Sequence, residues 1–588
     1  MPATLPSQPA AASQETSLLE GHGANSASQG QASTAARSVV IDANVSIGGM
    51  SLAQMIITAL HGHDRVKAEA MTTDCHVRTT QSMLLGEDLY NLPSNTSELL
   101  ERFFSSRNIL TPVFHVPTVR STFNAAILCP TGQRHLHQPT FILLNMILAL
   151  CTSHWMVVAE ADAAMARRYY DIAMALLQPS LLRDWTLEHV QALIIGARYL
   201  QGSNCANESW NILGLAIRIA HGLRLHQDPP KSDPIPLQET KRRTWYAAYT
   251  LDMHFSMIYE RPSAIRSADF TTRLPEDLDD DCIRDSGLLY PVPRPPSSSM
   301  TFFIRVIKLY QIVEDVLSRF SGDSLSGLKM VELVTTFDEA YQKWRQETPS
   351  HLVFDPKSLQ QGTTPSIPEP PWILVLRGHM LRILIHRHSM AWTLRRLVRP
   401  QREEDSMVSH ALQYSRKVCI ASATETIDIV ALRHEQTKQT MGLNWYNTYY
   451  LFNSAIILVS HIIDPAHSHD EHALAKVGQA LRMMRAMASD HSFAQRAYSF
   501  LQQLLRIGTA EGITLDTSGS SISAQATQST FPAEALARWG LEASPALPEL
   551  GLTQEEFDRM DTQVNVNPRA FSEPMWPFTG QCFFDALS

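Results

Sequence analysis

From about residue 96 onward, apolar residues recur every three or four positions, and short polar breaks separate the runs. The segment TLEHVQALIIGARYLQG (186–202) is typical, because Thr186 suits an N-cap, Glu188 lies in the first turn and Gly202 marks the exit. Strand-like alternation bounded by hairpin turns is nearly absent. The pattern therefore predicts an all-α protein with a large multi-helical domain.

Two of these runs are apolar enough to be enclosed. The run SWNILGLAIRIAHGLRLH (209–226) has one narrow polar stripe, which consists of Asn211, Gly214, Arg218 and His221. The run at 141–161 approaches the length that a bilayer requires, but it contains polar residues and continues into an amphipathic segment. We therefore predict buried helices in both places, and no membrane span.

Changes in composition divide the chain. Both ends are rich in small polar residues that bury little apolar surface, and Pro-rich breaks interrupt the helical runs. We predict a disordered leader (1–45), a linker (46–95), a helical domain (96–345), a Pro-rich break (346–371), a C-terminal helical part of the same region (372–510) and a largely disordered tail (511–588).

Charge and cysteine usage exclude several classes. The 588-residue chain has a formal net charge of -9 and a pI of about 6.2, so the molecule as a whole is not a polyanion binder. Its seven cysteines are widely scattered, which is neither a disulfide framework nor a C-x2-C zinc site. The N-terminus lacks the basic and apolar regions of a secretory signal.

The candidate chemistry is weak. In LPEDLDDDCIRD (274–285), Asp279, Asp280 and Asp281 are consecutive, so they point in different directions and predict a solvated loop, not a magnesium site. The histidines around 467–472 lack the HExxH arrangement, and the GxSxG, phosphate-loop and GxGxxG motifs are absent. We predict no catalytic, cofactor or metal site, and a protein that is not an enzyme.

The stretch KRRTWYAAYTLDMHFSMIYERP (241–262) combines a basic triplet with an aromatic helix. A helix through 245–259 places Trp245 and Asp252 on one broad apolar face, where a carboxylate is costly unless it is paired. Arg218, Arg242 or Arg243 could pair with Asp252. A ligand-sensing pocket and a DNA-contacting face are the alternatives, and three basic residues are a short patch for DNA.

Here the residues resemble the fungal-specific transcription factor domain, the all-helical middle homology region of fungal zinc-cluster regulators. The family pattern runs W-x-x-x-G-x-A-x-R-x-A-x-x-L-G-L-H-x-D, then R-R-x-W-W, L-D-R, S, G-R-P and L-P. The matching positions are Trp210, Gly214, Ala216, Arg218, Ala220, Leu223, Leu225, His226, Asp228, Arg242, Arg243, Trp245, Leu251, Asp252, Ser256, Arg261 and Pro262.

Four positions depart from this pattern. Arg224 and Glu260 stand where the pattern has glycine, Tyr246 replaces the second tryptophan, and Met253 replaces the arginine after the aspartate. The two lost glycines raise a question about local turn geometry.

The resemblance implies a nuclear transcriptional regulator that controls a metabolic or secondary-metabolite pathway. In the family, DNA is bound by a separate N-terminal zinc-cluster module with six cysteines, but only Cys75 precedes residue 96 here. The chain is therefore expected to act through a DNA-bound regulator or the transcription machinery, or through a module that it does not contain. Direct DNA binding, a cofactor and a membrane are not expected.

The resemblance leaves several partners open, namely a homo- or heterodimer and a small-molecule effector. The structural or regulatory candidates are Arg218, Arg242, Arg243, Trp245, Asp252 and Arg261. The acidic and aromatic terminus supplies activation-segment candidates, Phe583, Phe584 and Asp585. Two alternatives remain: a helical small-molecule-binding protein or pathway enzyme on the same scaffold, and a dimerising inhibitor of a complete family member.

Overall fold

The computed structural model describes a large central part of the chain. The described residues are 88–153, 163–181, 183–203, 205–291, 298–320, 326–354, 369–398, 406–436, 444–488 and 492–510. The predicted leader, most of the predicted linker, and the tail with Phe583, Phe584 and Asp585 lie outside these residues.

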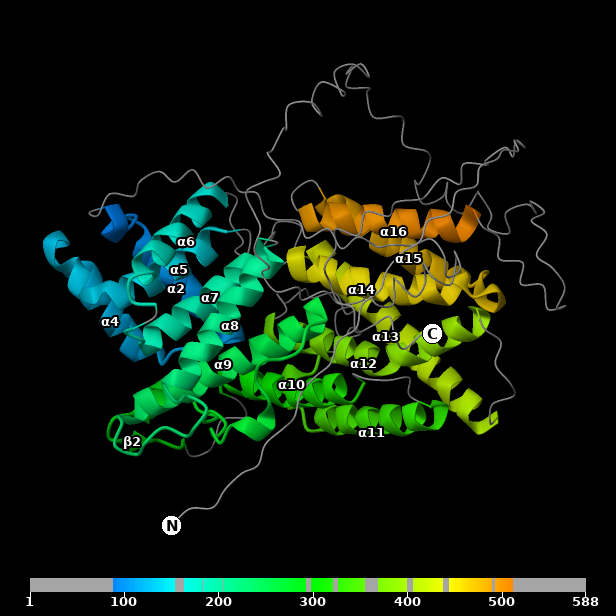
Figure 1. The fold of residues 1–588 in the computed structure, drawn as a ribbon, viewed down its shortest axis with the longest axis horizontal. Coiled ribbons are helices and arrows are strands. Elements are labelled where there is room, and N and C mark those ends of the chain that lie inside the picture. The colour runs from blue at the N-terminus through cyan, green and yellow to red at the C-terminus, as the bar shows by residue number, and fades with distance from the viewer. Residues whose placement is uncertain are drawn as a thin grey trace, which may run out of the picture. The chain divides into compact units, whose positions relative to one another are not determined.

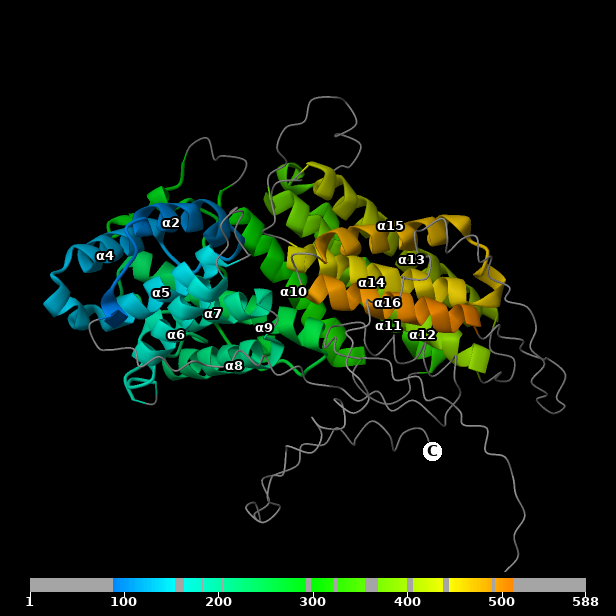
Figure 2. The same cartoon turned by 90° about the horizontal axis from the view of Figure 1, so that it is seen from above.

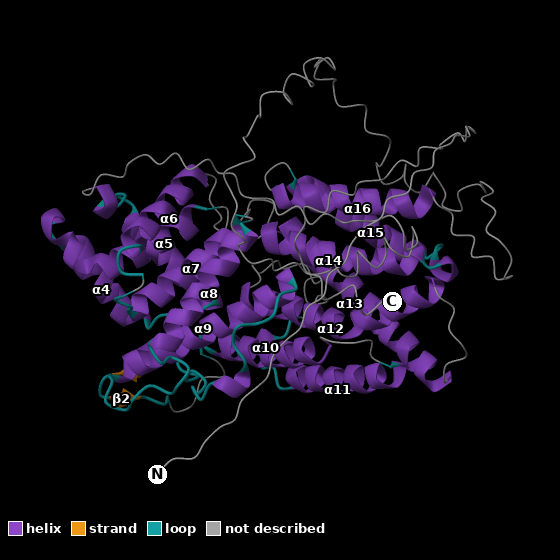
Figure 3. Ribbon diagram, viewed as in Figure 1, coloured by secondary structure: helices purple, strands orange, loops and turns teal. Residues whose placement is uncertain are grey.

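The all-α prediction is confirmed over the described residues (Figures 1 and 3). The first group of helices comprises α2 (Thr96–Arg102), α3 (Asn108–Leu110), α4 (Val116–Leu128), α5 (Gln138–Thr152), α6 (Ala163–Leu177), α7 (Leu187–Gly202), α8 (Ala206–Gly222), α9 (Ile235–Tyr259), α10 (Thr301–Phe320) and α11 (Gly327–Gln346). The second comprises α12 (Glu369–Val398), α13 (Ser406–Gln436), α14 (Asn444–Ile463), α15 (Glu471–Met487) and α16 (Ser492–Ala510). A small antiparallel hairpin joins β1 (Ile283–Arg284) to β2 (Gly287–Leu288).

Local sequence signals place several helix ends. The predicted N-cap Thr186 directly precedes α7, and its N–H donates to Nδ1 of His189 at 3.3 Å. Pro234 precedes α9 and Pro236 lies in its first turn, where a missing N–H costs nothing. Because α9 begins at Ile235, the basic triplet 241–243 lies inside the helix and not ahead of it.

The predicted enclosed runs are buried where the structure describes them, and residues 154–161 of the first run lie outside the described residues. Residues 140–151 of α5 are all buried, because α6 and α7 pack against this helix. On α8, Asn211, Gly214 and Arg218 are exposed and His221 is half-buried, while most of the intervening apolar residues are buried, which confirms the narrow polar stripe. Within the described part of the chain, no helix is both long and apolar enough to cross a bilayer.

The central helices connect the two groups. α9 packs on α7, α8 and α10, and α10 in turn packs on α11 and α12 (Figures 1 and 2). From α12 to α16, each helix contacts the next along the chain. The buried apolar side chains form one cluster that extends from Leu99 to Leu505, so the two groups share a core.

Candidate functional site

Helix α9 brings most of the candidate residues into one buried region. Its residues from Arg242 to Tyr259 are all buried, including both arginines of the basic triplet. Five side chains, which we name the α9 charge cluster, meet near its N-terminal half: Asp228, Glu239, Arg242, Arg243 and Asp280.

Arg243 lies at the centre of this cluster. Its side chain is 1% exposed, and its Nη1 lies 2.6 Å from Oδ1 of Asp280. The same nitrogen donates to the carbonyl of Phe114 at 2.8 Å, and Nε donates to Oε1 of Glu239 at 3.2 Å. Arg243 therefore joins α9 to the segment that leads into α4 and to the loop that carries Asp280.

Asp280 adds a second link between these segments. Its Oδ2 accepts the N–H of Val116 at 2.7 Å, and its carbonyl hydrogen-bonds Nε2 of His115 at 3.0 Å. The prediction of a solvated acidic loop is therefore wrong for Asp280, although Asp279 and Asp281 are exposed. Because consecutive carboxylates point in different directions, one of the three reaches an arginine while its neighbours face solvent.

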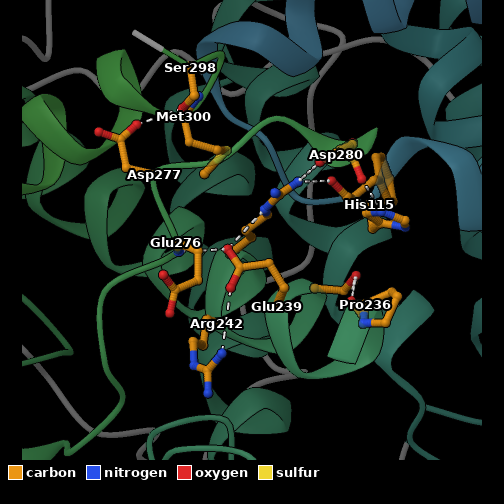
Figure 4. Close-up of polar contacts among 12 residues, drawn as sticks. His115, Pro236, Glu239, Arg242, Glu276, Asp277, Asp280, Ser298 and Met300 are labelled. Atoms are coloured by element: carbon orange, nitrogen blue, oxygen red, sulfur yellow. Dashed lines mark hydrogen bonds and ion pairs between the residues drawn. The ribbon is translucent and has the colours of Figure 1, made fainter. Parts of the chain in front are cut away.

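Figure 4 shows Glu239 between Arg242 and the backbone of Glu276. Oε1 of Glu239 accepts the Glu276 N–H at 3.0 Å, and Oε2 lies 3.5 Å from Nη1 of Arg242. Burial raises the pKa of Glu239, and the two arginines beside it act in the opposite direction. The carboxylate is thus enclosed but compensated by neighbouring positive charge.

Arg242 binds Asp228 with two hydrogen bonds. Nε and Nη2 lie 2.8 and 3.1 Å from the two carboxylate oxygens, the bidentate geometry that gives strong ion pairs. Nε of Arg273 contacts the same carboxylate at 2.8 Å. These hydrogen bonds, that of Arg242 foremost, lower the pKa of Asp228 to about 2.

The remainder of the acidic run holds the start of α10. Oδ1 of Asp277 accepts a hydrogen bond from Ser298 at 2.6 Å (Figure 4). The same oxygen accepts a hydrogen bond from Thr301 at 2.7 Å. Oδ1 of Asp279 accepts the N–H of Ser299 at 2.7 Å. Among the described residues, no group of three or more His, Cys, Asp or Glu side chains is arranged to hold a metal ion.

Asp252 departs from its prediction. It is 1% exposed, but its Oδ2 accepts the backbone N–H groups of Ala264 and Ile265, each at 2.8 Å. The prediction that an arginine pairs with Asp252 is therefore wrong, because the chain returns past the carboxylate after α9 ends. Burial raises the pKa of Asp252 to about 7, against the effect of those two hydrogen bonds.

The other predicted residues lie apart from the α9 charge cluster. Trp245 is fully buried, with His221 at 5.3 Å and Phe270 at 5.4 Å between ring centroids, so it is a core residue. Arg261 lies over the Trp210 ring at 5.4 Å. Arg218 is exposed and makes no ion pair or hydrogen bond with any residue that the structure describes.

A second buried polar group, not predicted from the sequence, lies where the two groups of helices meet. His254 of α9 hydrogen-bonds Gln201 of α7 at 3.1 Å and Tyr310 of α10 at 2.9 Å. Arg377 of α12 lies over the Tyr310 ring at 5.7 Å, and the His254 and Tyr446 rings are 5.8 Å apart. Burial lowers the pKa of His254 well below its usual value, so this histidine is neutral.

The two departures from the glycine pattern also have a structural outcome. Arg224 and Glu260 have φ values of 58° and 52°, the only positive values among the described non-glycine residues. Each follows the end of a helix, α8 and α9 respectively, where a left-handed residue closes the last turn. The turn geometry is therefore kept without glycine, at the cost of backbone strain.

Comparison with known proteins supports the resemblance. Residues 100–346 match the model of the fungal specific transcription factor domain, and this match ends at the last residue of α11. The chain is 25% identical over 471 residues to the transcription factor FBD3 of Gibberella moniliformis, covering 74% of this chain and 60% of that protein.

Two further relatives agree. The transcription factor FBD3 of Fusarium pseudograminearum is 27% identical over 71% of this chain and 58% of its own length. The transcriptional activator protein acu-15 of Neurospora crassa is 24% identical over 50% of this chain and 31% of its own length. The matches to both FBD3 proteins span about 60% of those relatives. The chain carries a fungal specific transcription factor domain, in residues 100–346.

Proposed function

We propose that this protein regulates transcription in the nucleus and controls a metabolic or secondary-metabolite pathway. The observation that carries the proposal is the domain match over residues 100–346, together with relatives that are named as transcription factors. In this proposal the chain reaches DNA through a DNA-bound regulator or through a module outside residues 1–588.

The α9 charge cluster supports an indirect role. Arg242 and Arg243 are at most 5% exposed and bind carboxylates, so their guanidinium groups do not face a phosphate backbone. DNA affinity depends on accessible cations that neutralise several phosphates. In this proposal Arg242 and Arg243 are structural residues of the domain, and Lys241, whose side chain is 27% exposed, pairs with Asp233.

A tethering assay tests the proposal. The full chain is fused to an unrelated DNA-binding domain in a fungal host that carries a reporter with the matching site. We expect the fusion to change reporter output relative to the DNA-binding domain alone. Activation of the reporter would identify the chain as an activator. The Phe583→Ala, Phe584→Ala variant then tests the terminal segment, and full activity of that variant would show that activation does not need Phe583 and Phe584.

Two further measurements test the proposal, namely the localisation of the protein and the transcript levels of a deletion strain. A tagged full-length protein that stays out of the nucleus, together with unchanged transcript levels after gene deletion, would overturn the proposal. Repression of a complete family member on overexpression, with co-purification of the two chains, would instead favour the dimerising inhibitor.

A further inference from the structure

A small pocket lies between α9, α12 and α14, where the domain that carries the family match meets the C-terminal helices. Met257 comes from α9, Met380 and Arg387 from α12, and Tyr449 and Asn453 from α14, with leucine and isoleucine side chains completing the wall. The lining residues are thus apolar except for the guanidinium of Arg387, the amide of Asn453 and the hydroxyl of Tyr449. A few polar groups in an apolar pocket are the usual composition of a small-molecule site.

The pocket is nearly closed in this structure. Its enclosed space has room for about one water molecule. Two of its walls are methionines, whose unbranched side chains rearrange at low cost. A ligand would therefore enter by displacing Met257 and Met380, and not by filling a preformed cavity.

Arg387 provides the charge. Its side chain is 19% exposed, and its acidic partner is Glu260, with Nη1 and Oε1 3.5 Å apart. A close charge-assisted hydrogen bond measures about 2.7–2.9 Å, so this ion pair is a loose one. A carboxylate at the pocket mouth could make the closer, bidentate contact with the guanidinium that Glu260 does not make.

The surroundings favour an anion. Arg377, three residues before Met380 on α12, is 9% exposed and forms no ion pair with any residue in the described ranges. Arg377 lies over the Tyr310 ring and hydrogen-bonds Tyr446 instead of a carboxylate, and because it is buried, its positive charge is weakly screened near Met380. The pocket therefore combines apolar walls with positive charge.

We infer that this pocket binds a small effector with an apolar body and one carboxylate, and that the carboxylate replaces Glu260 on Arg387. Only the regulatory role of this ligand rests on the proposed function, and its binding does not. Glu260 directly follows α9 in a left-handed conformation, and Asp252 holds the backbone at Ala264 and Ile265. Displacing Glu260 would thus change the contacts of the segment that connects α9 to the acidic run at 274–285.

The test uses the purified full chain and three probes that differ in one property each. Hexanoate carries both the apolar body and the charge, hexan-1-ol lacks the charge, and acetate lacks the body. Binding is measured by calorimetry, with thermal shift as a second readout. We expect hexanoate to bind at least about tenfold more tightly than either of the others, the range of one charged hydrogen bond.

Variants locate the site. Arg387→Gln is expected to weaken hexanoate binding by about tenfold or more, and Arg387→Lys to retain part of it. Arg482→Gln, at an exposed arginine of α15, is the matched control for the lost charge and leaves binding unchanged. Glu260→Gln removes the competing carboxylate and is expected to tighten binding by about threefold. A substitution that only destabilised the protein would weaken binding.

Equal binding of hexanoate and hexan-1-ol, or full binding by Arg387→Gln, would overturn the inference. Because these measurements need no reporter, they fail independently of the proposed function. A chain that binds hexanoate but neither enters the nucleus nor alters transcripts would retain the pocket and lose the regulatory role.

Discussion

The two halves of α9 bury their polar groups in different ways. In the N-terminal half, Glu239, Arg242 and Arg243 are compensated by side chains of opposite charge. In the C-terminal half, Asp252 is held by backbone N–H groups and His254 is neutral between two uncharged partners. The first half thus depends on ion pairs, and the second on keeping its titratable groups uncharged or hydrogen-bonded.

The comparison predicts where the larger loss of stability lies. Breaking a buried ion pair leaves an uncompensated charge, and here one arginine serves two carboxylates and a carbonyl. Losing a neutral hydrogen bond leaves only an unpaired polar group. The N-terminal half should therefore be the more sensitive one.

The largest effect is expected for Arg243→Met. Removing the guanidinium leaves Glu239 and Asp280 without their shared cation, and we expect the free energy of unfolding to fall by about 3–5 kcal/mol. Urea denaturation followed by circular dichroism measures it. Arg218→Met, at an exposed position, is the control and is expected to change stability by less than about 0.5 kcal/mol. Equal effects of the two variants would contradict the assignment of the α9 charge cluster.

The next effect concerns pH and Asp252. A folded-state pKa of about 7, above the usual value near 3.8, means that folding takes up a proton, so stability is present at low pH and is lost as pH rises toward 7. Between pH 4 and pH 7 this loss amounts to about 3 kcal/mol.

Asp252→Asn isolates that loss. The amide oxygen can still accept both N–H groups, because Ala264 and Ile265 donate to the same oxygen atom. The variant is expected to lose much less stability between pH 4 and pH 7 than the parent, as measured by urea midpoints at several pH values. A slope unchanged by the substitution would show that Asp252 is already ionised at acidic pH.

The third effect tests the neutral group directly. Tyr310→Phe removes the hydrogen bond to Nδ1 of His254 and leaves a fully buried ring nitrogen unsatisfied. We expect a loss of about 1–2 kcal/mol. Tyr290→Phe makes the same change at a half-exposed tyrosine and is expected to be neutral. Thermal unfolding of the two variants distinguishes a structural hydrogen bond from a nonspecific effect of the deleted hydroxyl.

The same contrast shows what could be predicted from the sequence. The Glu239–Arg243 pair follows from i,i+4 spacing on one helix, and the start of α9 follows from its prolines. The partners of Asp252 and His254 could not be predicted in this way. Backbone N–H groups carry no sequence signal, and Gln201 and Tyr310 are 53 and 56 positions away from His254.

Asp280 is a further residue whose partner could not be predicted from the sequence. Three consecutive aspartates have the composition of a solvated loop, and two of them are exposed. Only the packing of α9 against the segment before α4 decides which of the three meets Arg243, 37 positions away. The sequence indicated a buried ion pair in this region, but the acid that Arg243 binds is determined by the tertiary structure.

The smallest effect concerns the left-handed residues at the ends of α8 and α9. Arg224 has a φ of 58°, is exposed and has no side-chain partner among the described residues, so its conformation is strained without a compensating contact. Glycine adopts this φ freely, although it also gains freedom in the unfolded chain. We expect Arg224→Gly to raise the free energy of unfolding by about 0.5–1 kcal/mol.

Two variants decide whether conformation is the cause. Arg218→Gly makes the same substitution in the middle of α8, where φ is helical, and is expected to lower the free energy of unfolding by about 1 kcal/mol. Glu260→Gly relieves the same strain but loses the Arg387 contact, so its gain should be smaller than that of Arg224→Gly. Opposite signs at 218 and 224, measured by denaturant midpoints, would show that the backbone angle controls the outcome. Destabilisation by Arg224→Gly would mean that the arginine side chain stabilises this turn by more than the strain costs.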